Sequence, residues 1–96
     1  FRQRALEMPK TQHEIQNIKG LHARASAKLV ETVEQFDATA TVRKDGMDAD
    51  GDSIMGLLML AATIGTSIEV ETQGPQADAL SAAITALVND KFGEGD

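Results

Sequence analysis

Apolar and polar residues alternate in three segments of the chain, at 11–16, 38–44 and 67–72. Such alternation is typical of β-strands that bury one face and expose the other. The pair Asp45-Gly46 follows the second segment, and Asp-Gly favours a tight hairpin because both central residues of that turn have positive φ. A short return strand is therefore predicted at 47–49.

Two other segments have apolar residues spaced three and four positions apart, which is the pattern of a helix with one buried side. These helices are predicted at 23–35 and 76–91, and Gly74-Pro75 separates the second from the strand before it. The residues expected to face the core are Leu29, Val30, Val33 and Phe36 in the first helix and Ala77, Leu80, Ile84, Leu87 and Val88 in the second.

A third helix is predicted within the apolar run at 54–62, which is apolar on every side. Ser53 suits its start because a serine hydroxyl accepts a backbone N–H of the first turn, and Gly65 is a natural stop. A small domain cannot easily bury every side of such a helix, so part of it is expected to be covered by a partner. Leu57 and Leu60 are predicted to be its buried members.

The predicted order of elements is β-α-β-β-α-β-α. This order favours an α+β fold, an open-faced β-sandwich in which three helices cover one face of a four-stranded antiparallel sheet. Ninety-six residues suffice for one such domain with a single core. Residues 1–7 precede Met8 and are expected to be a leader or vector-derived segment, which leaves one domain at 8–96.

Composition and charge argue against several classes of function. Fifteen acidic and nine basic side chains give a net charge of −6, which disfavours a nucleic-acid partner bound through its phosphates. The chain has no cysteine, so disulfides and thiolate metal sites are excluded. The run at 54–62 is too short to cross a membrane, and no signal peptide is evident. A cytoplasmic protein without membrane insertion is the resulting prediction.

The segment that begins at Gly20 carries the clearest indication of chemistry. A strand-like stretch stops at Gly20 and a helix begins near His22, where unpaired backbone N–H groups and the helix dipole favour an anion such as phosphate. The imidazole of His22 is a nucleophile and a base near neutral pH, and the guanidinium of Arg24 follows two residues later. This arrangement is suited to holding a phosphoryl group covalently.

Spacing alone also allows plainer interpretations. A histidine beside a helix start is more often a capping or surface residue than a nucleophile, and Arg24 could be a solvated helix residue. His13 is interpreted as an ordinary strand residue. A zinc site built from His13 and His22 lacks enough ligands of the right kind.

A calcium loop is suggested by the alternate spacing of Asp48, Asp50 and Asp52. However, Ser53 and Met59 stand where such a loop requires glycine and glutamate, so this site is rejected. No cofactor motif and no second catalytic base is evident. We therefore expect no cofactor. We also expect that the protein is not an independent enzyme and that any catalysis depends on its partner proteins.

Two motifs together resemble one protein family. Gly20-Leu21-His22-Ala23-Arg24 and the serine-led apolar run at 53–62, in the predicted order of elements, are similar to HPr, the histidine phosphocarrier of the bacterial phosphoenolpyruvate-dependent phosphotransferase system. The likeness covers about residues 8–92. It implies that phospho-enzyme I phosphorylates His22 on Nδ1, that Arg24 steadies the phosphate, and that an enzyme IIA protein receives the group. It also implies regulatory phosphorylation of Ser53 by a separate HPr serine kinase/phosphatase.

The chain departs from the commonest family pattern at Ala25, where most members have proline. The pairing Ala25-Ser26 resembles the alphaproteobacterial and nitrogen-related branches, and Glu31 and Glu34 make the first helix less basic than in many relatives. The resemblance therefore leaves the acceptor open between sugar uptake and nitrogen or carbon regulation.

Ile54, Met55 and Leu58 are predicted to form the partner-binding surface, because methionine adapts to several partners and the short helix has little core to cover it. The alternative is that all three are core residues. A carrier must release its cargo, so an exposed His22 with few fixed contacts is expected.

One competing hypothesis comes from another functional class. A regulatory module of the same fold would bind partners through residues 54–62 and transfer no phosphate. The presence of both His22 and Arg24 argues against it, because a purely regulatory relative needs no nucleophile. A monomer that meets its partners briefly fits a carrier.

Overall fold

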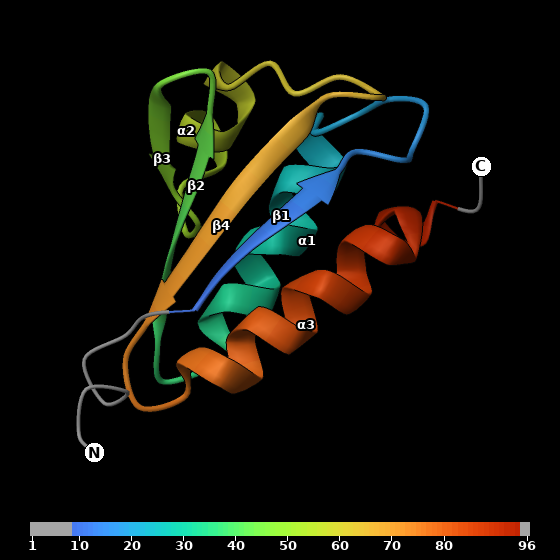
Figure 1. Ribbon diagram of the computed structural model, residues 1–96. Helices are drawn as coiled ribbons and strands as arrows, with labels where there is room; N and C mark the ends of the chain where they lie inside the picture. The colour runs from blue at the N-terminus through green and yellow to red at the C-terminus, as the bar shows by residue number, and fades with distance from the viewer. Residues whose placement is uncertain (1–8, 95–96) are drawn as a thin grey trace.

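The computed structural model describes residues 9–94, and the predicted leader at 1–7 lies outside them. The elements follow the order predicted from the apolar pattern (Figure 1). Their bounds are β1 Lys10–Glu14, α1 Ala23–Glu34, β2 Thr39–Lys44, β3 Met47–Asp50, α2 Ile54–Met59, β4 Ser67–Gln73 and α3 Ala77–Asn89, followed by one 3-10 turn, η2, at Lys91–Gly93.

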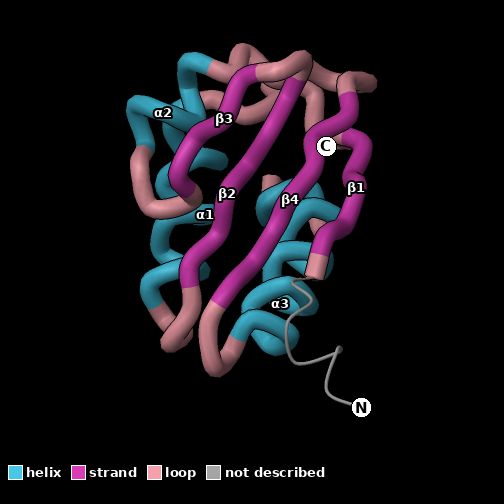
Figure 2. The backbone as a smooth tube through the Cα atoms, turned by 60° about the vertical axis from the view of Figure 1, so that its left-hand side comes forward, coloured by secondary structure: helices cyan, strands magenta, loops and turns pink. Residues whose placement is uncertain are grey.

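The strands form one antiparallel sheet in the order β1-β4-β2-β3, so the last strand of the sequence lies between the first and the second (Figure 2). Val70 of β4 is paired with Val42 of β2, and Val42 is paired with Ala49 of β3. Residues paired across neighbouring strands point to the same side of the sheet. All three are buried, which places the core on one face.

The helices lie on that same face: Figure 2 shows α1 and α3 behind the sheet, and the two helices pack against each other. The short α2 packs against α1 and β3. On the opposite, open face, Arg43 forms ion pairs with Asp48, Glu69 and Glu71. The predicted α+β architecture is therefore confirmed. Within residues 9–94, no helix has the length and apolar character needed to cross a bilayer.

The predicted hairpin and most of the predicted core are also confirmed. Asp45 and Gly46 have φ values of 51° and 81°, as the turn requires. The largest fully buried side chains include Ile15, Leu29, Leu57, Ile68, Leu80, Ile84 and Phe92. Phe36 and Leu87 are only half-buried and pack at the edge of the core.

The helix predicted within 54–62 ends earlier, at Met59. Leu60 is its C-cap, and Ala61 has a left-handed backbone with a φ of 53°. Leu60 and Ala62 nevertheless remain buried. The apolar pattern overestimated this helix because it records burial, which continues after the helical backbone has stopped.

The last helix also ends before the predicted boundary at 91. α3 ends at Asn89, and the chain turns into η2, where Lys91 and Phe92 have φ values of 54° and 55°. Phe92 is completely buried. The chain therefore leaves the helix axis in order to place an aromatic ring in the core.

Candidate functional site

Gly20 holds the loop before α1 in place. Its φ of 66° lies in the left-handed region that glycine adopts without strain. A β-carbon there would lie 2.4 Å from the carbonyl oxygen of Ala62 and 2.9 Å from the Cα of Thr63. Leu21 donates its N–H to the same carbonyl of Ala62 over 2.9 Å. The segment after α2 therefore fixes where α1 begins.

His22 is the N-cap of α1. Its backbone is extended, and its ring Nδ1 accepts the N–H of Arg24 over 3.4 Å. Its carbonyl accepts the N–H of Ser26 over 2.8 Å as the helix begins, and the Ser26 hydroxyl donates to the carbonyl of Leu21. Nδ1 thus lies at a helix N-terminus, where anions are favoured. The capping role and the predicted nucleophilic role involve the same nitrogen.

The other ring nitrogen of His22 contacts a residue from the far end of the chain. Nε2 forms a hydrogen bond with Oε2 of Glu94, 72 positions later. Oε1 of that carboxylate accepts from Nδ2 of Asn17 over 2.9 Å, and Asn17 also donates to the carbonyl of Gly20 over 2.8 Å. The loop before α1 and the C-terminal turn therefore meet at the histidine.

These contacts correct the expectation of an exposed His22 with few fixed partners. Its side chain is 26% exposed, and both ring nitrogens have a partner. The expectation was wrong because a residue outside the predicted helices supplies one of the two partners. Glu94 comes back to the start of α1 through η2 and the buried Phe92.

The contacts of Glu94 favour the charged form of its carboxyl group. Burial alone would raise the pKa of Glu94, whose side chain is 7% exposed. Hydrogen bonds from Asn17 and His22, together with electrostatic attraction from His22 and Lys19, outweigh burial and lower the pKa below its ordinary value of 4.5. The carboxylate is therefore an acceptor at neutral pH, so Nε2 of the ring must donate. Nδ1 accepts the N–H of Arg24 and so presents a lone pair, which is the requirement for attack on phosphorus.

Arg24 lies in the first turn of α1 with an exposed side chain. Its guanidinium takes part in none of the ion pairs found among residues 9–94. The backbone of Arg24 is fixed by the cap to His22, while the long side chain extends into solvent. It is positioned to turn toward an anion held at His22.

The predicted partner-binding residues begin α2. Ile54 and Met55 are 40% and 69% exposed, whereas Leu58 is half-buried. Leu57 and Leu60, predicted to be the buried members, are 0% and 2% exposed. The alternative in which Ile54, Met55 and Leu58 are all core residues is therefore wrong. Other exposed apolar residues nearby in sequence are Met59, at the end of α2, and Ile64, in the loop that follows.

Ser53 caps α2 as predicted. Its hydroxyl accepts the N–H of Gly56 over 3.0 Å, and its own N–H donates to the carbonyl of Asp50 over 3.1 Å. The side chain is half-buried, and Asp50 and Asp52 beside it are exposed. Ser53 therefore adjoins both an acidic turn and the exposed start of α2.

Sequence reasoning missed both residues that complete the site, Asn17 and Glu94. Asn17 lies between the strand predicted at 11–16 and the helix predicted at 23–35, and its side chain is fully buried, which is unusual for asparagine. Its position three residues before Gly20 is a local signal that could have drawn attention to it. Glu94 lies beyond the predicted helices, and no periodic pattern links it to His22.

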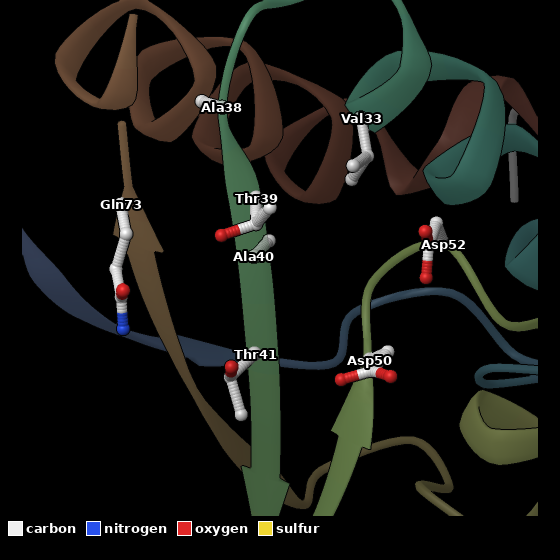
Figure 3. Close-up of a pocket in the computed structure, with 8 residues that line it drawn as sticks. All are labelled: Val33, Ala38, Thr39, Ala40, Thr41, Asp50, Asp52 and Gln73. Atoms are coloured by element: carbon white, nitrogen blue, oxygen red, sulfur yellow. The ribbon is translucent and has the colours of Figure 1, made fainter. Parts of the chain in front are cut away.

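A separate hollow of about 360 Å³ lies near the opposite end of α1 (Figure 3). Its lining residues are Val33, Ala38, Thr39, Ala40, Thr41, Asp50, Asp52 and Gln73. His22 and Val33 are eleven positions apart, which is roughly 16 Å along a helix. The hollow thus contains none of the predicted site residues. Among residues 9–94, no three His, Cys, Asp or Glu side chains are grouped to hold a metal ion.

Comparison with known proteins agrees with this fold. The family model described as "PTS HPr component phosphorylation site" matches residues 9–90. Phosphocarrier protein HPr of Neisseria meningitidis serogroup A is 48% identical over 89 residues, which cover 93% of this chain and 100% of that protein. Phosphocarrier protein NPr of Escherichia coli K12 is 45% identical over 82 residues, which cover 84% of this chain and 91% of that protein.

Solved structures give the same result. The crystal structure of HPr-C-His from Thermoanaerobacter tengcongensis is similar with a TM-score of 0.87 and 33% sequence identity. The match covers 91% of this chain and 98% of that one. This chain therefore belongs to the HPr family, the phosphocarrier proteins of the phosphotransferase system.

Proposed function

We propose that this protein accepts a phosphoryl group from phospho-enzyme I on Nδ1 of His22 and passes it to an enzyme IIA protein in the cytoplasm. The observation that supports this most directly is the orientation of the ring, with Nδ1 toward the N-terminus of α1 and Nε2 toward Glu94. The lone pair is then on the nitrogen at the anion-binding end. The protein acts as a carrier, since a partner must bring phosphorus into line with the nucleophile.

The first turn of α1 and Arg24 supply the positive field that transfer needs. When the phosphorus atom is in line with Nδ1, the equatorial oxygens of the phosphoryl group would lie near the backbone N–H groups of that turn. The N–H of Arg24, which donates to Nδ1 in the resting protein, becomes available to a phosphate oxygen once Nδ1 is bonded to phosphorus. The exposed guanidinium of Arg24 adds a mobile cation.

Enzyme I and enzyme IIA proteins are proposed to dock on the exposed start of α2. Ile54 and Met55 present apolar surface, and Leu58 lies half-buried behind them. Apolar residues beside a charged site suit a transient interface, and methionine adapts to more than one partner. Donor and acceptor then use one surface in turn, which fits a monomeric carrier.

Ser53 is proposed as a regulatory phosphorylation site for an HPr serine kinase. A phosphoryl group there would add negative charge beside Asp50 and Asp52 and next to Ile54. Such charge disfavours docking of a partner on the apolar surface by desolvation and repulsion. The effect on phosphoryl transfer is therefore electrostatic interference, with little change in fold.

Phosphorylation assays with enzyme I and labelled phosphoenolpyruvate test the carrier role. Label is expected in the parent and in His13→Gln, the matched histidine control, but absent from His22→Ala. The bound label should be acid-labile and alkali-stable, as a phosphohistidine is. A chase with enzyme IIA proteins of sugar-uptake and nitrogen-regulatory types then identifies the acceptor by its rate.

Absence of label from the parent protein would contradict the carrier role. If the parent stays unlabelled beside an active cognate enzyme I, the carrier proposal fails. A regulatory module that binds partners through α2 without transferring phosphate then becomes the leading account.

A further inference from the structure

A carboxylate, an imidazole and an amide form a connected group at the start of α1. Glu94 accepts from Nε2 of His22 through Oε2 and from Nδ2 of Asn17 through Oε1. The Glu94 side chain is 7% exposed and Asn17 is 0% exposed, so water has little access to the carboxylate and the amide. We propose that Glu94 is a positioning residue that keeps the ring proton of His22 on Nε2 throughout phosphoryl transfer. This inference rests on the proposed function of His22.

Both ring nitrogens of His22 indicate the same protonation state. An ionised carboxylate can only accept a hydrogen bond, so Nε2 carries the hydrogen that faces Glu94. The backbone N–H of Arg24 can only donate, so Nδ1 presents its lone pair. Two independent partners therefore select one tautomer and one ring orientation.

The ring keeps this proton through loading and delivery. On loading, the Nδ1 lone pair forms a bond to phosphorus while the bond from phosphorus to the donor nitrogen breaks, and its electron pair stays on the donor. The ring then carries a positive charge with Nε2–H unchanged, and the Glu94 carboxylate stabilises it as a carboxylate does in Ser-His-Asp triads. On delivery, the bond between Nδ1 and phosphorus breaks as the acceptor nitrogen attacks, and its electron pair returns to Nδ1.

The backbone around Glu94 adopts unfavourable conformations to bring the carboxylate to His22. Lys91 and Phe92 are non-glycine residues with φ values of 54° and 55°. Such strain persists where packing over-determines it, and it is concentrated at functional sites. Here the packing is supplied by Phe92, which is 0% exposed.

Asn17 bears a second unfavourable arrangement. Its Nδ2 donates to both the carbonyl of Gly20 and Oε1 of Glu94. Its Oδ1 is buried without a hydrogen-bond partner among the described residues. A buried acceptor left unpaired is destabilising. The two hydrogen bonds that Nδ2 donates therefore account for the orientation of this amide. Asn17 thereby fixes the second oxygen of the carboxylate that faces His22.

Glu94 could instead be a clasp, a residue that only holds the C-terminal turn in place. A clasp would make the same contacts but respond differently to mutation. Loss of a clasp lowers the stability of the fold and leaves the reactivity of a folded His22 unchanged. Loss of a positioning carboxylate lowers that reactivity toward any donor. The donor must therefore be varied as well as the protein.

The test compares Glu94→Ala and Glu94→Gln with the parent and with Asp90→Asn, which neutralises an exposed carboxylate near the same turn and outside the contacts of His22. Each protein is phosphorylated by phospho-enzyme I and, separately, by phosphoramidate, a small donor that needs no docking surface. Glu94→Ala should be slower by about tenfold or more with both donors. Glu94→Gln should be intermediate because its amide oxygen accepts from Nε2 without a charge, and Asp90→Asn should match the parent.

Proton NMR supplies the second readout. The Nε2–H resonance of His22 should be protected from exchange with water in the parent and in Asp90→Asn, and lost in Glu94→Ala. Circular dichroism confirms that the variants are folded at the assay temperature.

Three outcomes would contradict the proposals, and they are distinguishable. Equal phosphoramidate rates for the parent and Glu94→Ala overturn the positioning role, even if the variant is less stable, because Glu94 is then a clasp. A loss seen only with phospho-enzyme I also overturns it, since Glu94 then acts on partner docking. A parent that accepts phosphate from neither donor overturns the proposed function and this inference with it.

Discussion

His13 lies on the inner face of β1 with 8% of its surface exposed, and its Nε2 is 2.7 Å from the hydroxyl of Thr11. Burial lowers the pKa of His13 below its ordinary value of 6.5, because the charged ring loses its hydration. The side chain of His22, by contrast, is 26% exposed and lies at a helix start beside a carboxylate. The two histidines of the chain therefore lie in different environments, and we expect His13 to affect stability and His22 to carry the proposed chemistry.

The stability of the fold should fall in mild acid because of His13. Below pH 6.5 the unfolded chain binds a proton at His13, while the folded protein does not until its lower pKa is reached. Stability is therefore intact above pH 6.5 and is lost as the pH falls from there toward the folded pKa. The slope is less than the approximately 1.4 kcal/mol per pH unit that one full proton gives. Urea denaturation between pH 7.5 and 5.5 should show a smaller loss of stability for His13→Gln than for the parent. Equal losses in the two proteins would refute the attribution of this pH dependence to His13.

At the scale of elements, α2 depends on its neighbours for its existence. A helix of six residues is not stable in isolation. Ser53 satisfies one N–H at its start, Leu57 is buried beneath it, and the left-handed Ala61 follows its end. These anchors allow the residues at the start of α2 to remain exposed without unfolding the helix.

Two substitutions at Ser53 separate its capping role from its proposed regulatory role. Ser53→Ala should lower the free energy of unfolding by about 1 kcal/mol through loss of the cap, with transfer from enzyme I unchanged while the protein is folded. Ser53→Asp retains an oxygen acceptor and should keep most of the stability, but its charge beside Asp50 and Ile54 should slow phosphorylation. Urea denaturation and initial rates of labelling measure the two effects. Transfer to Ser53→Asp at the parent rate would count against the regulatory proposal.

At the scale of the whole molecule, the C-terminal turn closes the domain against the start of α1. Phe92 is completely buried, and η2 contacts both α1 and α3. The contact between His22 and Glu94 joins positions 72 residues apart. The candidate site therefore depends on a contact between the start of α1 and the end of the described chain.

Phe92 should matter more to stability than the half-buried Phe36. Phe92→Ala is expected to lower the free energy of unfolding by about 3–5 kcal/mol, the range for a fully buried phenylalanine. Phe36→Ala removes the same atoms from a less buried position and should have a clearly smaller effect. If Phe92→Ala does not fold, Phe92→Leu provides a milder version of the same change. Equal losses at the two positions, measured by urea denaturation, would show that the turn does not anchor the domain.

Much of this protein was determined by local properties of its sequence. The alternation of polar and apolar residues located the strands, and the three-and-four spacing located the long helices. Asp45-Gly46 identified the hairpin, and Ser53 identified the start of α2. The glycine and histidine before α1 identified an anion-binding helix start, and resemblance to HPr added the family. These features depend on residues within a few positions of one another, so they can be predicted without the fold.

The tertiary structure decided the rest, because the remaining features join distant parts of the chain. Burial continues through Leu60 and Ala62, so only the backbone shows where α2 stops. The partners of the His22 ring depend on where α3 ends and how η2 turns back. Residue spacing cannot encode a contact that spans 72 positions, since such a contact forms only when packing brings the two ends together. The sequence alone therefore determined the nucleophile candidate and its helix, while the fold decided which group each nitrogen of the ring contacts.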